Sequence, residues 1–210
     1  MCSKYWRIGV AFVAVAMVAI ACSAASASRL EIPNGSRGFR FGRIVSTEFI
    51  TELGTVNCEL QLSGTWRSRT ITKTAGSVIG EVNTGQLVSC TEGTVGTMLT
   101  TGTIPWEVRY SSYTGTLPEI ASVTFQVVGF RILIQPIGGI SCLYWSTAEA
   151  PLVFNAPVAA ERVFERVVIV NASRIPLRTP TMGCPGSLTI RGEGSMTVAG
   201  EFASVQIRLI

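Results

Sequence analysis

Histidine and aspartate are both absent from this chain of 210 residues, in which all thirteen acidic residues are glutamates. Their absence excludes Ser-His-Asp and Cys-His catalysis in the usual forms, and histidine-ligated zinc, copper and haem sites. EF-hand loops and the aspartate-based metal clamps of phosphoryl transfer are excluded as well. No GxxxxGK[ST] motif, and no GxGxxG motif opening a helix, is present to cradle a nucleotide. We therefore expect no cofactor, no metal site and no enzymatic activity.

Charge is also scarce, since only 14% of the residues are charged and the net charge is +4. The net charge falls to +2 when Lys4 and Arg7 are removed with the leader described below. A protein with so weak a field is not steered to a polyanion. We expect no nucleic-acid partner.

The first residues have the pattern of a secretory leader. Lys4 and Arg7 precede an apolar run over 8–21, and Ala25-Ser26-Ala27 forms a small-residue cleavage site. The apolar run is shorter than the ~20 residues that cross a bilayer as a helix. We predict a signal peptide over 1–27 and an extracellular protein. The alternative is a lipobox at 18–22, in which a lipidated Cys22 would anchor the protein to the outer face of the cytoplasmic membrane. Only this alternative predicts membrane contact.

Four cysteines remain beyond the leader, namely Cys58, Cys90, Cys142 and Cys184. Four cysteines in an exported protein indicate two disulfides, for which three connectivities exist. We predict the nearest-neighbour pairs, Cys58 with Cys90 and Cys142 with Cys184. A four-thiolate zinc site usually contains CxxC pairs, and no two of these cysteines are close in sequence.

The region 28–210 reads as a single β-rich domain. Apolar and polar residues alternate over 59–66 and again over 104–113, and Thr-rich runs favour strands over helices. About ten short strands without a convincing helix predict an all-β fold, an antiparallel β-sandwich or barrel-like domain.

Three local features of this domain can be predicted. Strands over 59–66 and 69–82 are expected to meet in a tight turn at Arg67–Ser68, inside the Cys58–Cys90 loop. The apolar face of the long run 122–134 switches near Gly129, which predicts a one-residue bulge. Strands over 187–199 and 201–210 are expected to form a terminal hairpin around Gly200.

The candidate binding residues all lie in one segment. They are Trp106, Glu107, Tyr110 and Tyr113. Together with Trp66, Tyr144 and Trp145 the aromatic residues could form a stacking platform for sugar rings, or they could pack in the core of the β fold. Glu107 and Glu119 are the best-placed pair of carboxylates for a glycoside hydrolase, which needs only two. The alternative for Glu107 is an ion pair with Arg109 on a solvated face.

Two segments carry a resemblance to known sequences. They are GTWRSRTITK over 64–73 followed by Ile79-Gly80, and IPWEVRY over 104–110 followed by YTGTLP over 113–118. They resemble a group of uncharacterised secreted proteins of actinobacterial type, in which Leu is commoner at the position of Ile104. The resemblance covers most of the chain after the leader and implies an exported, disulfide-bonded β domain. The group has no assigned activity, so it transfers no catalytic residue.

These observations lead to one main hypothesis and two rivals. The main hypothesis is a secreted, non-enzymatic β domain with a structural or binding role at or outside the cell envelope, in contact with the cell surface or a polysaccharide. The first rival is a carbohydrate-binding module or a Glu-dependent glycoside hydrolase. The second is a secreted protein that inserts amphipathic hairpins into membranes.

Overall fold

The computed structural model describes residues 29–32, 38–90, 95–98, 104–116, 119–135, 140–159, 168–198 and 207–209. Every regular element within these ranges is a β-strand, and all of the strand pairs are antiparallel. None of the described residues belongs to a helix long and apolar enough to cross a membrane. The predicted leader, with Cys22, lies outside the described residues.

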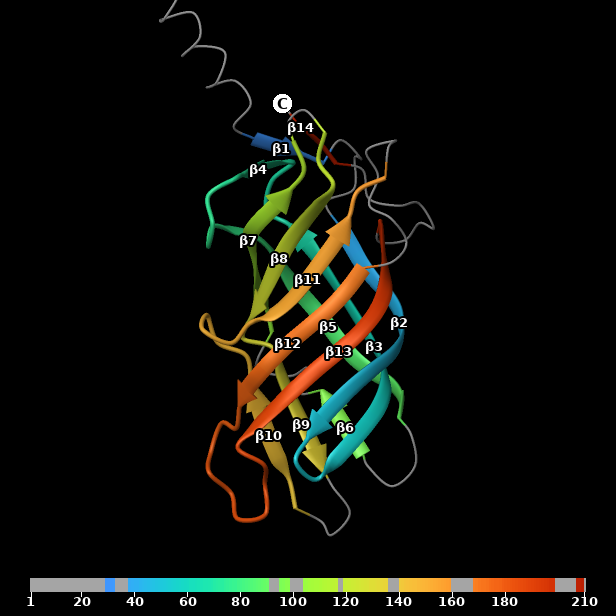
Figure 1. The fold of residues 1–210 in the computed structure, drawn as a ribbon, viewed down its shortest axis with the longest axis vertical. Helices are drawn as coiled ribbons and strands as arrows, with labels where there is room; N and C mark the ends of the chain where they lie inside the picture. The colour runs from blue at the N-terminus through green and yellow to red at the C-terminus, as the bar shows by residue number, and fades with distance from the viewer. Residues whose placement is uncertain are drawn as a thin grey trace, which may run out of the picture.

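Eight strands close into a barrel in the order β11-β12-β13-β2-β3-β5-β7-β8 (Figure 1). The barrel closes where β8 pairs with β11, from Val127 opposite Leu152 to Ser122 opposite Pro157. Its strands are β2 (Gly38–Thr51), β3 (Gly54–Trp66), β5 (Val78–Cys90), β7 (Trp106–Thr114), β8 (Ser122–Val128), β11 (Leu152–Pro157), β12 (Val168–Pro176) and β13 (Ser187–Val198). The all-β prediction is confirmed, and of its two forms the barrel is the one that the chain adopts.

Apolar side chains fill the interior of the barrel. Along β3, every second residue from Cys58 to Trp66 is buried, while the residues between them face outward. This alternation follows from the period of two in a strand. The ring of Trp66 lies 4.6 Å from that of Phe39 and 5.5 Å from that of Phe125, measured between centroids. An eight-stranded barrel is just wide enough for side chains to fill it, and here large aromatic residues do so.

A small sheet in the order β14-β1-β4 lies at one end of the barrel (Figure 1). It consists of β1 (Arg29–Glu31), β4 (Thr70–Thr72) and β14 (Arg208–Leu209), and it buries Leu30 and Ile71. One prediction is wrong here. The connection from β3 to β5 is not a tight turn at Arg67–Ser68, because it contains β4, which pairs with β1. The last described residues, in β14, pair with β1 as well. Residues 199–206 of the expected terminal hairpin lie outside the described residues.

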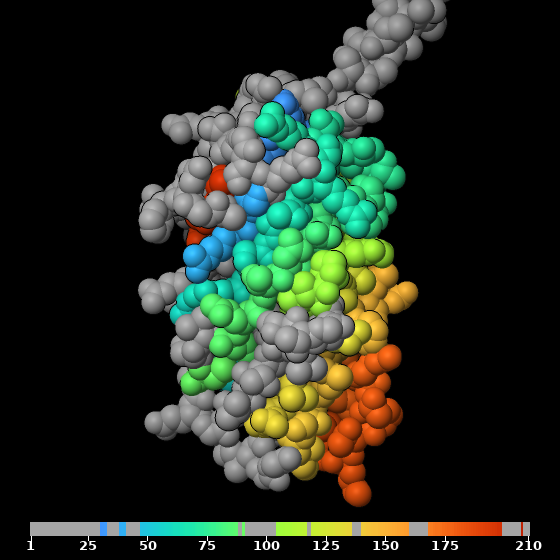
Figure 2. Space-filling model, turned by 180° about the vertical axis from the view of Figure 1, so that it is seen from behind, coloured from blue at the N-terminus to red at the C-terminus, as the bar shows by residue number. Residues whose placement is uncertain are grey.

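A second small sheet, in the order β10-β9-β6, lies at the opposite end. Its strands are β6 (Val95–Met98), β9 (Arg131–Gln135) and β10 (Cys142–Trp145). Figure 2 shows from behind that the yellow residues of β9 and β10 lie beside the orange residues that follow β12.

The switch of apolar face near Gly129 is real, but its cause is not a bulge within one strand. Gly129 has a φ of 89°, and the chain turns there from β8 in the barrel to β9 in the second sheet. The buried hydroxyl of Ser146 secures this crossing. It accepts a hydrogen bond from the Phe130 N–H at 3.0 Å and donates one to the Val127 carbonyl at 3.2 Å.

Both predicted disulfides are formed. Cys58 and Cys90 occupy directly paired positions on β3 and β5. Cys142 on β10 is bonded to Cys184 in the loop between β12 and β13, which ties the second sheet to the barrel. Two such bonds belong to a protein that matures in an oxidising environment.

Candidate functional site

Strand β7 divides the four predicted binding residues between the two sides of the barrel wall. Trp106 and Tyr110 point inward and are only 1% and 2% exposed. The rings of Trp106 and Phe130 pack in a T-shaped arrangement, with centroids 5.2 Å apart. Burial, and secondarily the neighbouring Tyr113, raise the pKa of Tyr110 above its ordinary value. Rings enclosed in this way offer no face to a sugar. Trp106 and Tyr110 therefore pack in the core, which is the alternative that the sequence left open.

Tyr113, near the end of β7, is partly exposed, and the ammonium group of Lys73 lies 5.2 Å from the centroid of its ring. Glu107 faces outward and forms an ion pair with Arg109, with 2.6 Å between Nη2 and Oε2. The guanidinium also donates from Nε at 2.9 Å. This is the ion pair that the sequence offered as the alternative role of Glu107.

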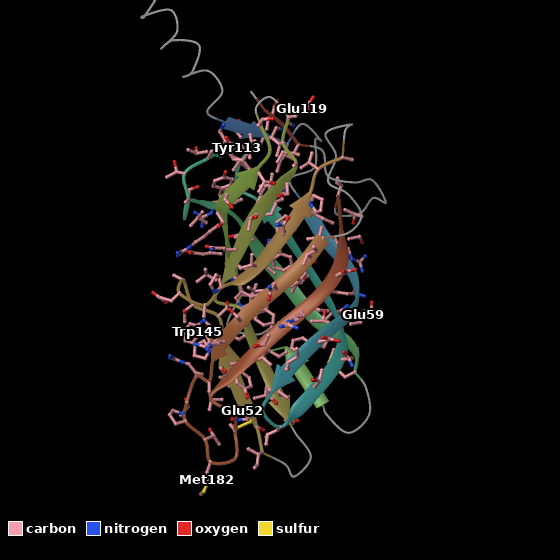
Figure 3. The ribbon with its side chains drawn as sticks, in the orientation of Figure 1. Glu52, Glu59, Tyr113, Glu119, Trp145 and Met182 are labelled. Atoms are coloured by element: carbon pink, nitrogen blue, oxygen red, sulfur yellow. A yellow bond between two sulfur atoms is a disulfide. The ribbon has the colours of Figure 1, made fainter. Side chains whose placement is uncertain are left out.

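Glu119 does not approach Glu107. It lies on the exposed connection beyond the far end of β7, near the upper end of the molecule in Figure 3. A strand rises about 3.3 Å per residue, so the length of β7 separates the two carboxylates by roughly 20 Å. Glycoside hydrolysis needs carboxylates about 5–10 Å apart. The two glutamates proposed from the sequence therefore do not form one site.

The outer wall of the barrel carries a polar groove of about 410 Å³ across β2, β3 and β5. We call it the amide groove, and its polar lining residues are Arg40, Gln61, Ser63, Thr84 and Gln86. The side-chain oxygen of Gln61 accepts hydrogen bonds from Arg40 at 3.1 Å and from Gln86 at 3.0 Å. The hydroxyls of Ser63 and Thr84 bond to each other. These contacts link the polar side chains of three strands to one another.

A second groove, of about 470 Å³, crosses β12, β13 and β2. We call it the charged groove, because Glu48, Arg191 and Glu193 line it beside Asn171. Arg191 stands directly opposite Glu48 on one neighbouring strand and opposite Asn171 on the other. Sequence reasoning missed this set, because nothing local to residues 48 and 191 signals that β2 pairs with β13.

Trp145, another aromatic residue of the predicted platform, has two cationic groups beside its ring. The guanidinium carbons of Arg131 and Arg178 lie 3.9 and 4.2 Å from its ring centroid. Figure 3 shows Trp145 on the outer side of the lower half of the molecule. Alternation alone could have identified it as outward-facing, because Cys142 and Tyr144 on the same strand are buried.

A smaller pocket of about 100 Å³ lies between the β2–β3 turn and the second sheet, lined by Phe49, Leu53, Cys142, Tyr144 and Pro185 among others. The hydroxyl of Tyr144 donates to the Pro185 carbonyl at 3.1 Å. Burial, and secondarily the charge of Glu52, raise the pKa of Tyr144. Ligand pockets usually measure about 300–1,000 Å³, a range that the two outer grooves reach and this pocket does not. Among the described residues, no three cysteines or glutamates gather to hold a metal ion.

These features define a class of structure: a disulfide-bonded, closed antiparallel barrel with a filled interior and polar grooves on its outer wall. Comparison of the chain with protein-family models, with curated proteins and with solved structures finds no match.

Proposed function

We propose that the protein is exported and acts as a non-enzymatic binding domain at or outside the cell envelope. One observation carries the proposal: the barrel interior is occupied by its own side chains, so recognition is left to the outer wall. The two disulfides and the secretory pattern of residues 1–27 support export. The resemblance to secreted proteins of actinobacterial type supports export as well, since it implies an exported, disulfide-bonded β domain.

A polysaccharide of the cell surface is the partner that best suits the amide groove. Amide and hydroxyl side chains are both donors and acceptors, as sugar hydroxyls are. The hydrogen bonds around Gln61 hold the lining side chains in place before any ligand arrives. Binding to a preorganised surface loses less conformational entropy than binding to a mobile one.

The test is retention on insoluble cell-wall polysaccharide. We expect the exported protein to be retained, and a Gln61→Ala, Gln86→Ala double variant to be retained more weakly. Gln126→Ala is the matched control, because Gln126 lies on β8, outside the set of residues that line the amide groove. Absence of retention of the wild type would contradict the proposed function. Equal retention of both variants would contradict the role of the amide groove.

A Glu-dependent glycoside hydrolase is the second candidate, and the charged groove is the observation that favours it. Glu48 and Glu193 both line this groove, so it brings two carboxylates to one place on the surface. A glycoside hydrolase needs two carboxylates in one site. Against this candidate, Glu193 is exposed, whereas the general acid of such an enzyme is normally shielded from water.

Release of reducing sugar from soluble polysaccharides separates the two candidates. The hydrolase candidate predicts release by the wild type that is lost in Glu48→Gln and in Glu193→Gln, and retained in Glu119→Gln. Release that is unaffected by the first two substitutions, or no release at all, would refute it.

A further inference from the structure

The stack of Arg131, Trp145 and Arg178 is built by three adjacent segments of chain. Arg131 on β9 stands directly opposite Trp145 on β10. On the other side of β10, Leu177 pairs with Tyr144, and the Arg178 N–H donates to the Leu143 carbonyl at 2.7 Å. The indole therefore has one guanidinium approaching from each neighbouring segment. Such cation–π contacts fix the guanidinium planes.

No acidic side chain among the described residues neutralises the two positive charges. Within the described part of the chain neither guanidinium forms an ion pair, and the shielded Nε of Arg131 has no hydrogen-bond partner. Glu149 is the acidic residue nearest to Trp145 in sequence, and its carboxyl is engaged elsewhere. A hydrogen bond with the Thr147 side chain, followed by one with its own backbone, lowers the pKa of Glu149.

We infer that this stack, hereafter the arginine clamp, binds an oxyanion carried by an extracellular glycan, either a carboxylate or a phosphate ester. A guanidinium is a planar fork of N–H donors that matches both groups bidentately. Both guanidinium carbons lie close to the same ring centroid, so the two forks flank one indole and place two positive charges at one point of the surface. The inference rests on the proposed binding function and names the chemistry that it recognises.

A glycan fits the surroundings of the clamp better than a dense polyanion does. Nucleic acids and anionic membranes are bound by wide basic surfaces that neutralise many phosphates together. This chain has a net charge of only +4 and offers two arginines at this place. Two fixed charges suit the isolated anionic groups of a polymer that is otherwise neutral and rich in hydroxyls.

Fluorescence titration of the folded, oxidised protein tests the inference. Trp66 and Trp106 are buried, which leaves Trp145 as the described tryptophan best placed to report an anion at its edge. The probes are oligogalacturonate for carboxylate, a poly(glycerol phosphate) oligomer for phosphate, neutral dextran oligomers, and phosphatidylglycerol vesicles. We expect one or both of the anionic oligomers to bind. Arg131→Gln and Arg178→Gln should each weaken that binding by about tenfold or more.

Arg69→Gln is the matched control, since it removes one exposed positive charge outside the clamp and should leave the affinity unchanged. Arg178 is exposed, so its variant should fold, and a thermal unfolding curve verifies this. Three results would overturn the inference. They are binding of dextran as tight as that of the anionic oligomers, a loss of affinity in Arg69→Gln equal to that in the clamp variants, and binding to the vesicles alone. If both clamp variants are retained on cell-wall polysaccharide as well as the wild type is, the role of the arginine clamp is contradicted but the proposed function is not. If the wild type is not retained, both the clamp and the proposed function are contradicted.

Discussion

Ser146→Ala should destabilise the protein by about 2 kcal/mol. The side chain is fully buried where the chain leaves the barrel, and its hydroxyl bonds both the Phe130 N–H and the Val127 carbonyl. The substitution removes little volume but leaves the Phe130 N–H without its partner. An unsatisfied buried donor costs about 1–3 kcal/mol. For a domain of this size, each kcal/mol lowers Tm by about 2–4 °C, so we expect a decrease of about 4–8 °C.

The measurement is urea unfolding at neutral pH, followed by tryptophan fluorescence, with calorimetry for Tm. Ser112→Ala on β7 is the control, because its side chain is exposed and the change should stay within about 0.5 kcal/mol. Hydrogen exchange adds a local readout, since the Phe130 amide should exchange faster in Ser146→Ala. A loss below about 0.5 kcal/mol with unchanged exchange at Phe130 would refute the assignment of Ser146 as the group that secures the crossing.

Four further predictions concern stability. Gly64→Ala should destabilise strongly, because its Cβ would clash with the Glu81 carbonyl oxygen, whereas a Cβ at Gly186 meets open space, so Gly186→Ala should be neutral. Urea unfolding of both variants checks this. Reduction of either disulfide should lower the free energy of unfolding by about 4 kcal/mol in the chain-entropy model, and Cys→Ser pairs compared with the oxidised protein measure it. Stability should fall as the pH rises above about 10, because the unfolded state releases the tyrosine protons at lower pH than the folded state, in which the pKa values of Tyr110 and Tyr144 are raised. The slope is up to about 1.4 kcal/mol per pH unit for each tyrosine, and Tyr110→Phe and Tyr144→Phe should reduce it. Thr47→Val should raise the free energy of unfolding by about 1 kcal/mol, since the buried Thr47 hydroxyl has no partner among the described residues; a decrease in stability would contradict this.

What could be predicted from the sequence is what depends on local alternation. Burial of every second residue follows from the pleat, so the inward faces of β3 and β7 could be assigned from their residues alone. The position of the face change at Gly129 was likewise visible. The pattern does not reveal which strand each half pairs with, so the sequence alone does not distinguish a turn between two sheets from a bulge within one strand.

Pairings between distant segments had no local signal. The pairing of β2 with β13 brings Glu48 beside Arg191, and residues near the two ends of the described chain meet in β1 and β14. A strand's neighbours are chosen by the packing of the whole barrel, which one sequence does not display. The arginine clamp illustrates the same limit. Alternation turns Trp145 outward, but only the loop after β12 brings Arg178 to its ring.

The filled interior has a consequence for the location of function. Many eight-stranded barrels that bind small molecules do so inside, where the walls exclude water. Here Trp66, Trp106 and Phe125 occupy that space. A ligand cavity inside the barrel would require smaller residues at these positions, and the core would lose their buried aromatic side chains. The outer wall is free of this constraint, because its side chains contribute little to stability. The amide groove, the charged groove and the arginine clamp all lie on outward-facing positions. We therefore expect substitutions that abolish binding to leave the unfolding curve almost unchanged, and substitutions in the interior to change stability first.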